Sequence, residues 1–329
     1  MQKKILIIGP EFFGYTKLIA RAFESRKYYV DIINERIGSS FFAKLITRLG
    51  ILKYFPFAVE KKQDEINRHI IHSNYQYIVF FNPETVSESF VRDIVKKTRA
   101  KVLIYFWDSF QNKRGFTGYL GIRGVSYVSF DPRDCEKYEL RYQPLFYDDT
   151  YVSDSINYQD RCFFISCVCT IHSERILFLS KLYDWSIQNK KHVFIYLYYH
   201  SLLQLLIKFI RYPIHCWKLR YFFKEIPLTH NQISQKLKSS INVLDVSHPS
   251  QSGLTSRTFE SLAAGCRLIT TNKSIERHQD LFGHYILVKL DDLESSLSTA
   301  NEQLENDQVP ESINKALLHN WVGELIYND

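Results

Sequence analysis

The sequence lacks the short motifs that mark most metal, redox and dinucleotide sites. Its six cysteines, at positions 135, 162, 167, 169, 216 and 266, form no C-x-x-C pair, and none stands at zinc-finger spacing from a histidine. Buried free thiols in a reducing compartment account for them better. The first apolar run is followed by Gly9-Pro10-Glu11-Phe12-Phe13-Gly14. The proline and the two phenylalanines would obstruct the pyrophosphate turn of a G-x-G-x-x-G site, which excludes a dinucleotide-dependent oxidoreductase or epimerase.

The chain also lacks a hydrophobic run typical of a secretion signal or a membrane span. The run Ile5–Gly9 is too short for a signal and is typical of a first buried strand. The most apolar window, Val193–Ile210, carries His200, Gln204 and Lys208 and is barely long enough to cross a bilayer. We therefore expect a cytoplasmic protein that is soluble or peripherally bound to a membrane.

Positive charge is concentrated in the first half of the chain. Residues 1–150 hold 24 Lys and Arg against 17 Asp and Glu, whereas the remainder holds 18 of each. A surplus of this sign favours polyanions such as an acidic membrane surface or a pyrophosphate-linked acceptor. No RNP-type aromatic signature, zinc finger or basic repeat is present, so nucleic acid is not an expected partner.

Short apolar runs alternate with helical patterns along the first half, which is typical of a parallel sheet covered by helices. The expected strands are Lys4–Gly9, Val30–Asn34, Tyr77–Phe81, Val102–Phe106 and Val125–Phe130. The helices expected between them are Tyr15–Arg26, Val59–Ser73 and Ser87–Arg99. Ligands of open α/β sheets bind beyond the carboxyl ends of the strands, so the polar clusters that follow these strands should line a cleft.

The stretch Tyr142–Asp149 breaks this alternation and is read as an interdomain linker. The expected strands of the second half are Cys162–Cys169, His192–Tyr198, Ile241–Val246, Arg267–Thr271 and Tyr285–Lys289. The expected helices are Glu174–Asn189, Ser201–Arg211, His230–Lys238, Ser256–Ala264 and the tail Ser312–Ile326. A chain of 329 residues exceeds the usual single domain. Two successive α/β halves therefore predict two facing Rossmann-like domains, residues 1–144 and 145–329, with the last helix, about 312–326, returning to the first.

One segment of the second half has the features of an anion site. A buried strand ends in a polar loop with Gly253, and a helix begins near Thr255. Unpaired backbone N–H groups and the positive end of the helix dipole attract anions there. Thr255 and Ser256 add hydroxyl donors, Arg257 supplies a charge suited to a pyrophosphate, and Glu260 lies on the same helix face to accept ribose hydroxyls. An ordinary helix start with a surface Arg–Glu pair explains the same spacing.

The segment Gln251–Glu260, followed by Leu268–Asn272, resembles the donor-binding signature of GT-B glycosyltransferases, and most closely that of bacterial lipopolysaccharide and capsule biosynthesis enzymes related to the CgeB-like group. Further stretches resemble that group in the same order along nearly the whole chain. They are Ile7–Tyr15, Tyr105–Ser109, Ser129–Asp134 and Tyr142–Tyr147.

The resemblance implies a GT-B fold with an acceptor-side first domain and a second domain that binds a nucleotide-sugar. The donor-binding residues it implies are Arg175, Gln251, Gly253, Leu254, Thr255, Ser256, Arg257 and Glu260. His248 lies just upstream of the anion turn and could donate to a phosphate or a sugar hydroxyl, although a lone histidine is more often structural. Glu260 would bind the ribose, the turn Gly253–Arg257 would bind the diphosphate, and Arg175 would neutralise the leaving charge. A solvated arginine at a helix start explains Arg175 equally well. Many retaining enzymes of this fold have a second Glu eight positions earlier, where this chain has Ser252, so the stereochemical outcome stays open.

Sugar transfer with inversion needs a general base for the acceptor hydroxyl. We predict Asp108 for this role, because it follows an apolar strand at an end that should face the cleft; a cap of the next segment is the structural alternative. Trp107 could stack on a sugar ring, and Glu11 and Gly14 in the first loop could approach the acceptor or the diphosphate. Asp131 and Asp134 compete with Asp108 for this role, but Asp131 precedes a proline and is read first as a turn and helix cap.

The absence of any Asp-x-Asp favours stabilisation of the leaving group by arginine and helix dipole, with no metal and no cofactor. Two basic, apolar segments, Phe41–Phe55 and Lys208–Lys224, suit an anionic membrane surface. A core-facing helix with a solvated basic edge is the favoured interpretation of the second.

Together these features predict a glycosyltransferase that takes a sugar from a nucleotide-sugar to a lipid-linked glycan or a lipopolysaccharide, O-antigen or capsule-type acceptor at the inner face of the cell membrane. The alternative is a non-catalytic module that binds nucleotide or glycan on the same scaffold.

Overall fold

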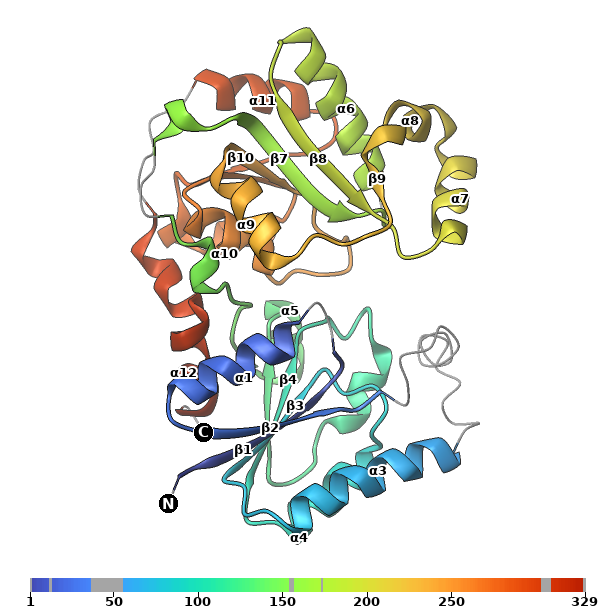
Figure 1. Cartoon of the computed structure of the whole chain (residues 1–329), viewed down its shortest axis with the longest axis vertical. Coiled ribbons are helices and arrows are strands. Elements are labelled where there is room, and N and C mark those ends of the chain that lie inside the picture. The colour runs from blue at the N-terminus through green and yellow to red at the C-terminus, as the bar shows by residue number, and fades with distance from the viewer. Residues whose placement is uncertain are drawn as a thin grey trace. The chain divides into compact units, whose positions relative to one another are not determined.

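The computed structural model of the chain describes residues 2–11, 14–36, 56–153, 157–172, 174–302 and 309–327. They form two compact units (Figure 1): unit 1 comprises Met1–Leu145 with Leu318–Asp329, and unit 2 comprises Phe146–Leu317. The predicted membrane segment Phe41–Phe55 lies wholly outside the described residues. None of the helices in the described part of the chain has the length and hydropathy needed to cross a bilayer.

Unit 1 is built on a parallel sheet with the strand order β2-β1-β3-β4-β5-β6. Its strands are β1 (Lys4–Gly9), β2 (Tyr29–Asn34), β3 (Tyr77–Phe81), β4 (Lys101–Phe106), β5 (Val125–Ser129) and β6 (Arg141–Tyr142). Its helices are α1 (Tyr15–Ser25), α3 (Pro56–Ile71), α4 (Glu88–Lys97), α5 (Pro132–Tyr138) and α12 (Leu318–Tyr327). The central strands are apolar on both faces, as expected for a parallel sheet covered by helices on each side.

The two faces of this sheet have separate cores. Side chains of α3 and α4, such as Ile66 and Phe90, pack with the set of strand residues that includes Ile78 and Ile104. Helix α1 packs beside α12, whose Trp321 contacts Phe81 and Tyr105, with ring centroids 6.5 and 5.1 Å away. Helix α12 thus completes the core of unit 1, although its sequence follows unit 2.

The C-terminal tail differs from the single helix predicted over Ser312–Ile326. The structure has a 3-10 turn, Glu311–Ala316, then an extended Leu317 with ψ near 127°, and only then α12. Tyr147 holds the chain at this break: its backbone N–H donates to the Ala316 carbonyl at 3.0 Å, and it forms a parallel bridge with Leu317. Apolar residues occur on both sides of this break, because those before it are buried in unit 2 and those after it in unit 1. The sequence pattern therefore resembled one continuous helix.

Unit 2 has a second parallel sheet, with the strand order β12-β11-β10-β7-β8-β9. Its strands are β7 (Phe163–Thr170), β8 (Val193–Tyr198), β9 (Phe223–Lys224), β10 (Ser240–Asp245), β11 (Arg267–Thr270) and β12 (Tyr285–Leu287). Its helices are α6 (Arg175–Gln188), α7 (Leu202–Arg211), α8 (Pro213–Lys218), α9 (His230–Lys238), α10 (Ser256–Ala263) and α11 (Leu293–Glu302). Helices α6, α8 and α11 contribute to one core cluster and α9 and α10 to another.

Candidate functional site

The start of α10 lies where the anion-site motif was predicted. Thr255 is the residue before the helix: its hydroxyl oxygen accepts from the Thr258 backbone N–H, and its hydroxyl proton is donated to Asp245 Oδ2 at 2.7 Å. A threonine hydroxyl has one proton. This proton is engaged by Asp245, so the side chain ties α10 to the end of β10, and its predicted donation to a phosphate stays a prediction.

The loop between β10 and α10 is fixed by the end of β11. Asn272 Nδ2 donates to the Gly253 carbonyl at 2.9 Å, and the Ser247 backbone N–H donates to Thr271 Oγ1 at 2.9 Å. Within this loop Gly253, Leu254 and the first helical residue Ser256 are buried, whereas Gln251 is half-buried. The predicted donor-binding turn is thus a rigid, well-packed loop.

Arg257 and Glu260 form a buried ion pair, which differs from the surface pair that the spacing also allowed. Their closest atoms, Arg257 Nη1 and Glu260 Oε2, are 2.7 Å apart, and the side chains are 17% and 3% exposed. Burial raises the pKa of Glu260, while Arg257, His230 and a hydrogen bond from Tyr151 oppose the rise. The Tyr151 hydroxyl also lies 3.1 Å from His230 Nδ1. Sequence reasoning found the pair but missed Tyr151 and His230, because α9 and the segment after the linker bring them in from far away along the chain.

Arg175 lies at the carboxyl ends of the adjacent strands β7 and β10. Its Nε donates to the Val246 carbonyl at 2.8 Å, and its Nη1 donates to Thr170 Oγ1 at 3.2 Å. The pKa of the Cys169 thiol near the end of β7 is lowered, first by its contact with Cys167 and then by Arg175 and Arg257, against the effect of burial. Arg175 thus joins the ends of β7 and β10, and the charges of Arg175 and Arg257 both favour the thiolate form of Cys169.

His248 and His172 lie beside Arg175, with their ring centroids 5.4 Å apart. Burial, and then Arg175, lowers the pKa of both rings, that of His172 to about 3, so both are neutral at pH 7. His248 Nδ1 accepts from the Ser250 backbone N–H at 3.3 Å. Its ring proton is consequently on Nε2, where it can be donated to a ligand oxygen.

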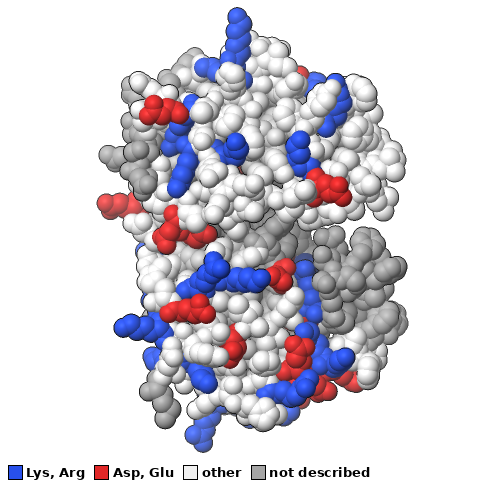
Figure 2. Space-filling model, in the orientation of Figure 1, with Lys and Arg blue, Asp and Glu red and all other residues white. Residues whose placement is uncertain are grey.

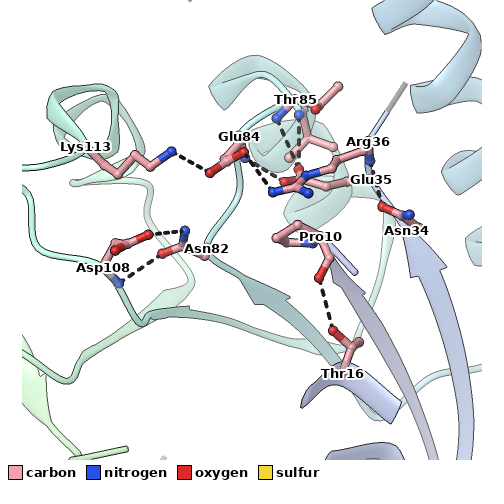
Figure 3. Close-up of polar contacts among 11 residues, drawn as sticks. Pro10, Thr16, Asn34, Glu35, Arg36, Asn82, Glu84, Thr85, Asp108 and Lys113 are labelled. Carbon is pink, nitrogen blue, oxygen red and sulfur yellow. Dashed lines mark hydrogen bonds and ion pairs between the residues drawn. The ribbon is translucent and has the colours of Figure 1, made fainter. Parts of the chain in front are cut away.

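The second set of predicted residues lies at the carboxyl edge of the sheet in unit 1 (Figure 3). Asn82 follows β3, and Asp108 follows β4 after Trp107. Asn82 Nδ2 donates to Asp108 Oδ2 at 3.3 Å, and the Asp108 backbone N–H donates to Asn82 Oδ1 at 3.2 Å. Asn82 has a positive φ of 49°, a conformation that asparagine tolerates better than most residues. This paired contact fixes the Asp108 carboxylate while leaving the residue half-buried.

A buried carboxylate at the same edge was missed by the sequence analysis. Glu35 directly follows β2 and is fully buried; its two oxygens accept from the backbone N–H groups of Glu84, Thr85 and Val86 at 2.7, 3.2 and 3.4 Å (Figure 3). Burial raises the pKa of Glu35 to about 7, although these three hydrogen bonds lower it. The position of Glu35 directly after a strand could have marked it as a candidate. The neighbouring sequence does not show that its carboxylate would contact the backbone of residues 84–86.

The other predicted residues of unit 1 have mixed surroundings. Trp107 is stacked on Phe81, with centroids 5.4 Å apart, so one ring face is already covered. Glu11 is exposed and pairs with Lys17 at 3.0 Å. Gly14 precedes α1 with φ 77°, a conformation that favours glycine.

The two aspartates that compete with Asp108 have structural roles. Asp131 caps α5 by accepting from the Arg133 backbone N–H, as predicted. Asp134 accepts from the Phe110 backbone N–H at 2.8 Å, and burial raises its pKa to about 6.

The structure therefore gathers the predicted residues into two sets. Arg175, His248 and the Arg257–Glu260 pair belong to unit 2, whereas Asp108, Trp107, Glu11 and Gly14 belong to unit 1. No cluster of three or more His, Cys, Asp or Glu side chains suited to a metal ion occurs among the residues that the structure describes.

A scan against protein-family models and a search of curated proteins both find no match to this chain. Solved structures, in contrast, match it over nearly its full length. Sucrose-phosphate synthase from Thermosynechococcus elongatus is similar with a TM-score of 0.68 at 8% identity, covering 99% of each chain. The lipopolysaccharide outer core galactosyltransferase WaaB is similar with a TM-score of 0.59 at 13% identity, again covering 99% of each. The UDP-GlcNAc 2-epimerase of Methanocaldococcus jannaschii, solved with UDP-GlcNAc and UDP, has a TM-score of 0.56 at 12% identity and covers 99% of this chain and 100% of its own.

Identities this low establish the fold and not the activity. Two six-stranded parallel sheets with helices on their faces, matched over the full chain, confirm the architecture predicted from the sequence: the chain has the GT-B fold of these glycosyltransferases.

Proposed function

We propose that the protein is a glycosyltransferase that moves a sugar from a nucleotide-sugar to a glycan acceptor, lipid-linked or of the lipopolysaccharide, O-antigen or capsule type. The observation that carries the proposal is the grouping of Arg175, His248 and the buried Arg257–Glu260 pair around the carboxyl ends of β7 and β10 in a GT-B fold. The carboxyl ends of parallel strands are where ligands of such sheets bind.

In the proposed reaction the donor lies in unit 2. Arg257 and Arg175 bind the diphosphate, and their positive charges stabilise the nucleoside diphosphate as it leaves. His248 Nε2–H donates to a phosphate oxygen. Because Gly253 has no side chain, the backbone of its turn can approach the diphosphate. Glu260 accepts from the ribose hydroxyls, which requires its carboxylate to exchange part of its contact with Arg257 for the donor.

Asp108 acts on the acceptor. Its carboxylate takes the proton of the acceptor hydroxyl, whose oxygen forms a bond to the anomeric carbon while the bond from that carbon to the diphosphate oxygen breaks. The contact with Asn82 holds the carboxylate in place for this transfer. The proton and charge balance uses side chains of the protein alone, so the proposal includes neither a metal ion nor a cofactor. The proposal covers an inverting course; a retaining course would not use Asp108 in this way.

We also propose a narrower family and a cellular location for this activity. The quoted motifs support a relation to the CgeB-like group of lipopolysaccharide and capsule enzymes, and the basic first half supports work at the inner, cytoplasmic face of the cell membrane. A non-catalytic nucleotide- or glycan-binding module is the second candidate, and one observation favours it. Glu260 is almost fully buried and already paired, as a purely structural carboxylate would be.

The test is a panel of UDP-, GDP-, CMP- and dTDP-sugars mixed with the purified protein and followed for nucleotide release, with glycan acceptors present or absent. We expect one donor to release its nucleotide, with a rate that falls at least about a hundredfold in Arg257→Ala, because a cation at the leaving group is worth several kcal/mol. Product analysis separates transfer from epimerisation, in which the sugar stays on the nucleotide.

A matched control is Glu65→Ala, which breaks another i,i+3 ion pair, Lys62–Glu65, away from the site. This variant should keep the wild-type rate. Turnover that survives Glu260→Ala and Arg257→Ala unchanged would remove the donor-site assignment, and nucleotide binding without any turnover of the donors would favour the non-catalytic module.

A further inference from the structure

Helices α7 and α8 of unit 2 present aliphatic and aromatic side chains to solvent. We define the α7–α8 surface by Leu203, Leu206, Ile207, Ile210, Ile214 and Trp217, all of them exposed. Leu203 is 66% exposed, Ile210 73% and Trp217 66%. In Figure 2 the surface of unit 2 over α7 is mainly white, with few coloured charged groups. An exposed apolar cluster of this kind usually marks a site that contacts another molecule or a membrane.

Helix α7 is apolar on both of its sides. Leu205, Phe209 and Tyr212 face inward and pack against the core cluster that includes Ile195 and Leu197 of β8. The opposite side, which in a solvated surface helix carries polar groups, carries leucine and isoleucine. The favoured interpretation of this segment was a core-facing helix with a solvated basic edge. It accounts for the inner side of α7, but it is wrong for the outer side, which is apolar and exposed.

The charged residues within the segment that forms this surface have one sign. From His200 to Lys224 the chain has five Lys and Arg residues and no Asp or Glu. Arg211 lies over the ring of Tyr212, and Arg220 lies over the rings of Trp217 and Tyr221, at 5.3, 4.8 and 4.3 Å from the centroids. Lys218 is paired with Asp184 of α6, so Arg211 and Arg220 are the better probes of the positive charge.

We propose that the α7–α8 surface docks on an anionic lipid bilayer. Aliphatic side chains enter the boundary between headgroups and acyl chains, tryptophan and tyrosine lie at headgroup level, and arginine contacts the acidic headgroups. Ten residues of α7 span only about 15 Å, so the helix lies along the membrane plane and does not cross it.

Charge argues against two other occupants. The apolar segment Phe41–Phe55 of the same chain carries Lys44, Arg48 and Lys53 and no acid, so it has the same sign as the α7–α8 surface. A second copy of the chain, joined by this surface around a two-fold axis, would bring like charges together. A negatively charged apolar partner fits best, and a lipid leaflet has both properties.

Flotation of the full-length protein with vesicles tests the proposal. The vesicles are phosphatidylcholine alone or phosphatidylcholine with about one third phosphatidylglycerol, a fraction chosen to give a strongly negative surface. We expect binding to the anionic vesicles, weakened at least about tenfold in Leu203→Glu/Ile210→Glu, since two carboxylates would have to enter the interface. Arg211→Gln/Arg220→Gln should reduce the preference for anionic over neutral vesicles.

The matched control is Ile187→Glu/Phe282→Glu, which places the same two charges at other exposed apolar positions of unit 2, 60% and 82% exposed. It should float as the wild type does. Circular dichroism of each variant checks that it is folded. Wild-type protein that does not float, or Leu203→Glu/Ile210→Glu that floats normally, overturns the proposal; the second outcome would locate membrane binding elsewhere, for example in Phe41–Phe55.

Light scattering across a concentration series adds an independent outcome. A wild-type dimer that Leu203→Glu/Ile210→Glu converts to a monomer would assign the surface to a second copy and also overturn the proposal. Vesicle binding and donor turnover are separate measurements, so the failure of one leaves the other standing.

Discussion

The Arg257–Glu260 pair is expected to contribute both to the stability of unit 2 and to donor binding. A guanidinium and a carboxylate within 2.7 Å at low exposure satisfy each other, whereas either one alone would be a poorly solvated charge. Glu260 is the more buried partner, and the Tyr151 hydrogen bond and His230 are the remaining groups that favour its charged form. The loss of Arg257 should therefore be felt in stability as well as in donor binding.

A double-mutant cycle on urea unfolding measures this coupling. Arg257→Met should destabilise the protein by about 3 kcal/mol, since breaking a buried pair leaves a buried charge. Arg257→Met/Glu260→Gln should cost clearly less than the sum of the two single changes, because the uncompensated charge is gone.

The comparison pair is Lys62–Glu65, which has the same i,i+3 spacing on α3 but a half-exposed glutamate. Its cycle should be additive within about 0.5 kcal/mol, as for other solvated pairs. Additivity at Arg257 and Glu260 would mean that the two groups do not interact as the structure indicates.

Glu35 predicts a pH dependence with a defined sign. Its folded pKa, about 7, is above the ordinary value of 4.5, so the unfolded chain releases this proton first as the pH rises. The contribution of Glu35 to stability is therefore most favourable below pH 4.5 and is lost as the pH rises through 7, by an amount on the order of 3 kcal/mol for a fully buried carboxyl.

Urea unfolding of wild type and Glu35→Gln at pH 5 and pH 8 checks this expectation. Glu35→Gln should be less stable than wild type at pH 5, because an amide nitrogen cannot accept from the 84–86 backbone, but its stability should change less between the two pH values. Asp64→Asn, an exposed change on α3, should leave the wild-type pH dependence intact. Equal pH dependence in Glu35→Gln and wild type would assign the titration to another group.

At the site, sequence reasoning recovers what is local. Thr255, Arg257 and Glu260 lie within one helix start, so spacing alone placed them together. The residues that fix them, Tyr151, Asp245 and Asn272, come from other elements, and no pattern in one sequence reports such contacts. The same holds in unit 1, where Asp108 was predicted and its partner Asn82 was not.

Among the secondary-structure elements, α12 shows how a short helix can hold a domain together. Its Trp321 is fully buried, donates from Nε1 to the Pro144 carbonyl at 2.7 Å, and its own carbonyl accepts from Gln143 Nε2 at 2.8 Å. Arg141 donates to the Glu324 and Leu325 carbonyls, at 2.9 and 2.6 Å, near the end of the helix where such groups lack helical partners.

We therefore expect Trp321→Ala to destabilise unit 1 by about 3–5 kcal/mol, as large-to-small changes of buried aromatic residues do. Trp217→Ala, which removes the same side chain from an exposed position, should change stability by less than about 0.5 kcal/mol. Thermal or urea unfolding of the two variants makes the comparison. Similar losses in both would show that α12 does not complete the core of unit 1.

The elements that the sequence predicted correctly share a strong pattern. Strands with continuous apolar runs, such as β1 and β3, and helices with a clear apolar stripe were predicted to within about three residues of their observed ends. The strands β6 and β9 are only two residues long, and α11 has a weak apolar stripe, so none of the three was predicted. The helical tail was predicted without its break at Leu317, which depends on the contact with Tyr147.

At the scale of the whole molecule, the two units differ in net charge and in the candidate functional residues that they contain. The excess of Lys and Arg lies within residues 1–150, mostly in unit 1, whereas unit 2 holds the two arginines and the histidine proposed to bind the donor. Each unit has its own hydrophobic core. A nucleotide that binds without an acceptor should therefore change amide exchange in unit 2 and leave unit 1 unchanged.

Hydrogen exchange with and without a nucleoside diphosphate tests this division. If the donor binds as proposed, amides of 246–257 in unit 2 should exchange more slowly with the nucleotide, because a ligand of the native state raises the free energy of opening. At a ligand concentration of about a hundred times Kd, that increase is about 2.7 kcal/mol, or roughly a hundredfold in exchange rate where opening limits it. Amides around Glu35 and Asn82 in unit 1 should be unaffected, and Arg257→Ala should abolish the protection in unit 2. Protection confined to unit 1 would reverse the assignment of donor and acceptor units, since the fold alone does not decide between them.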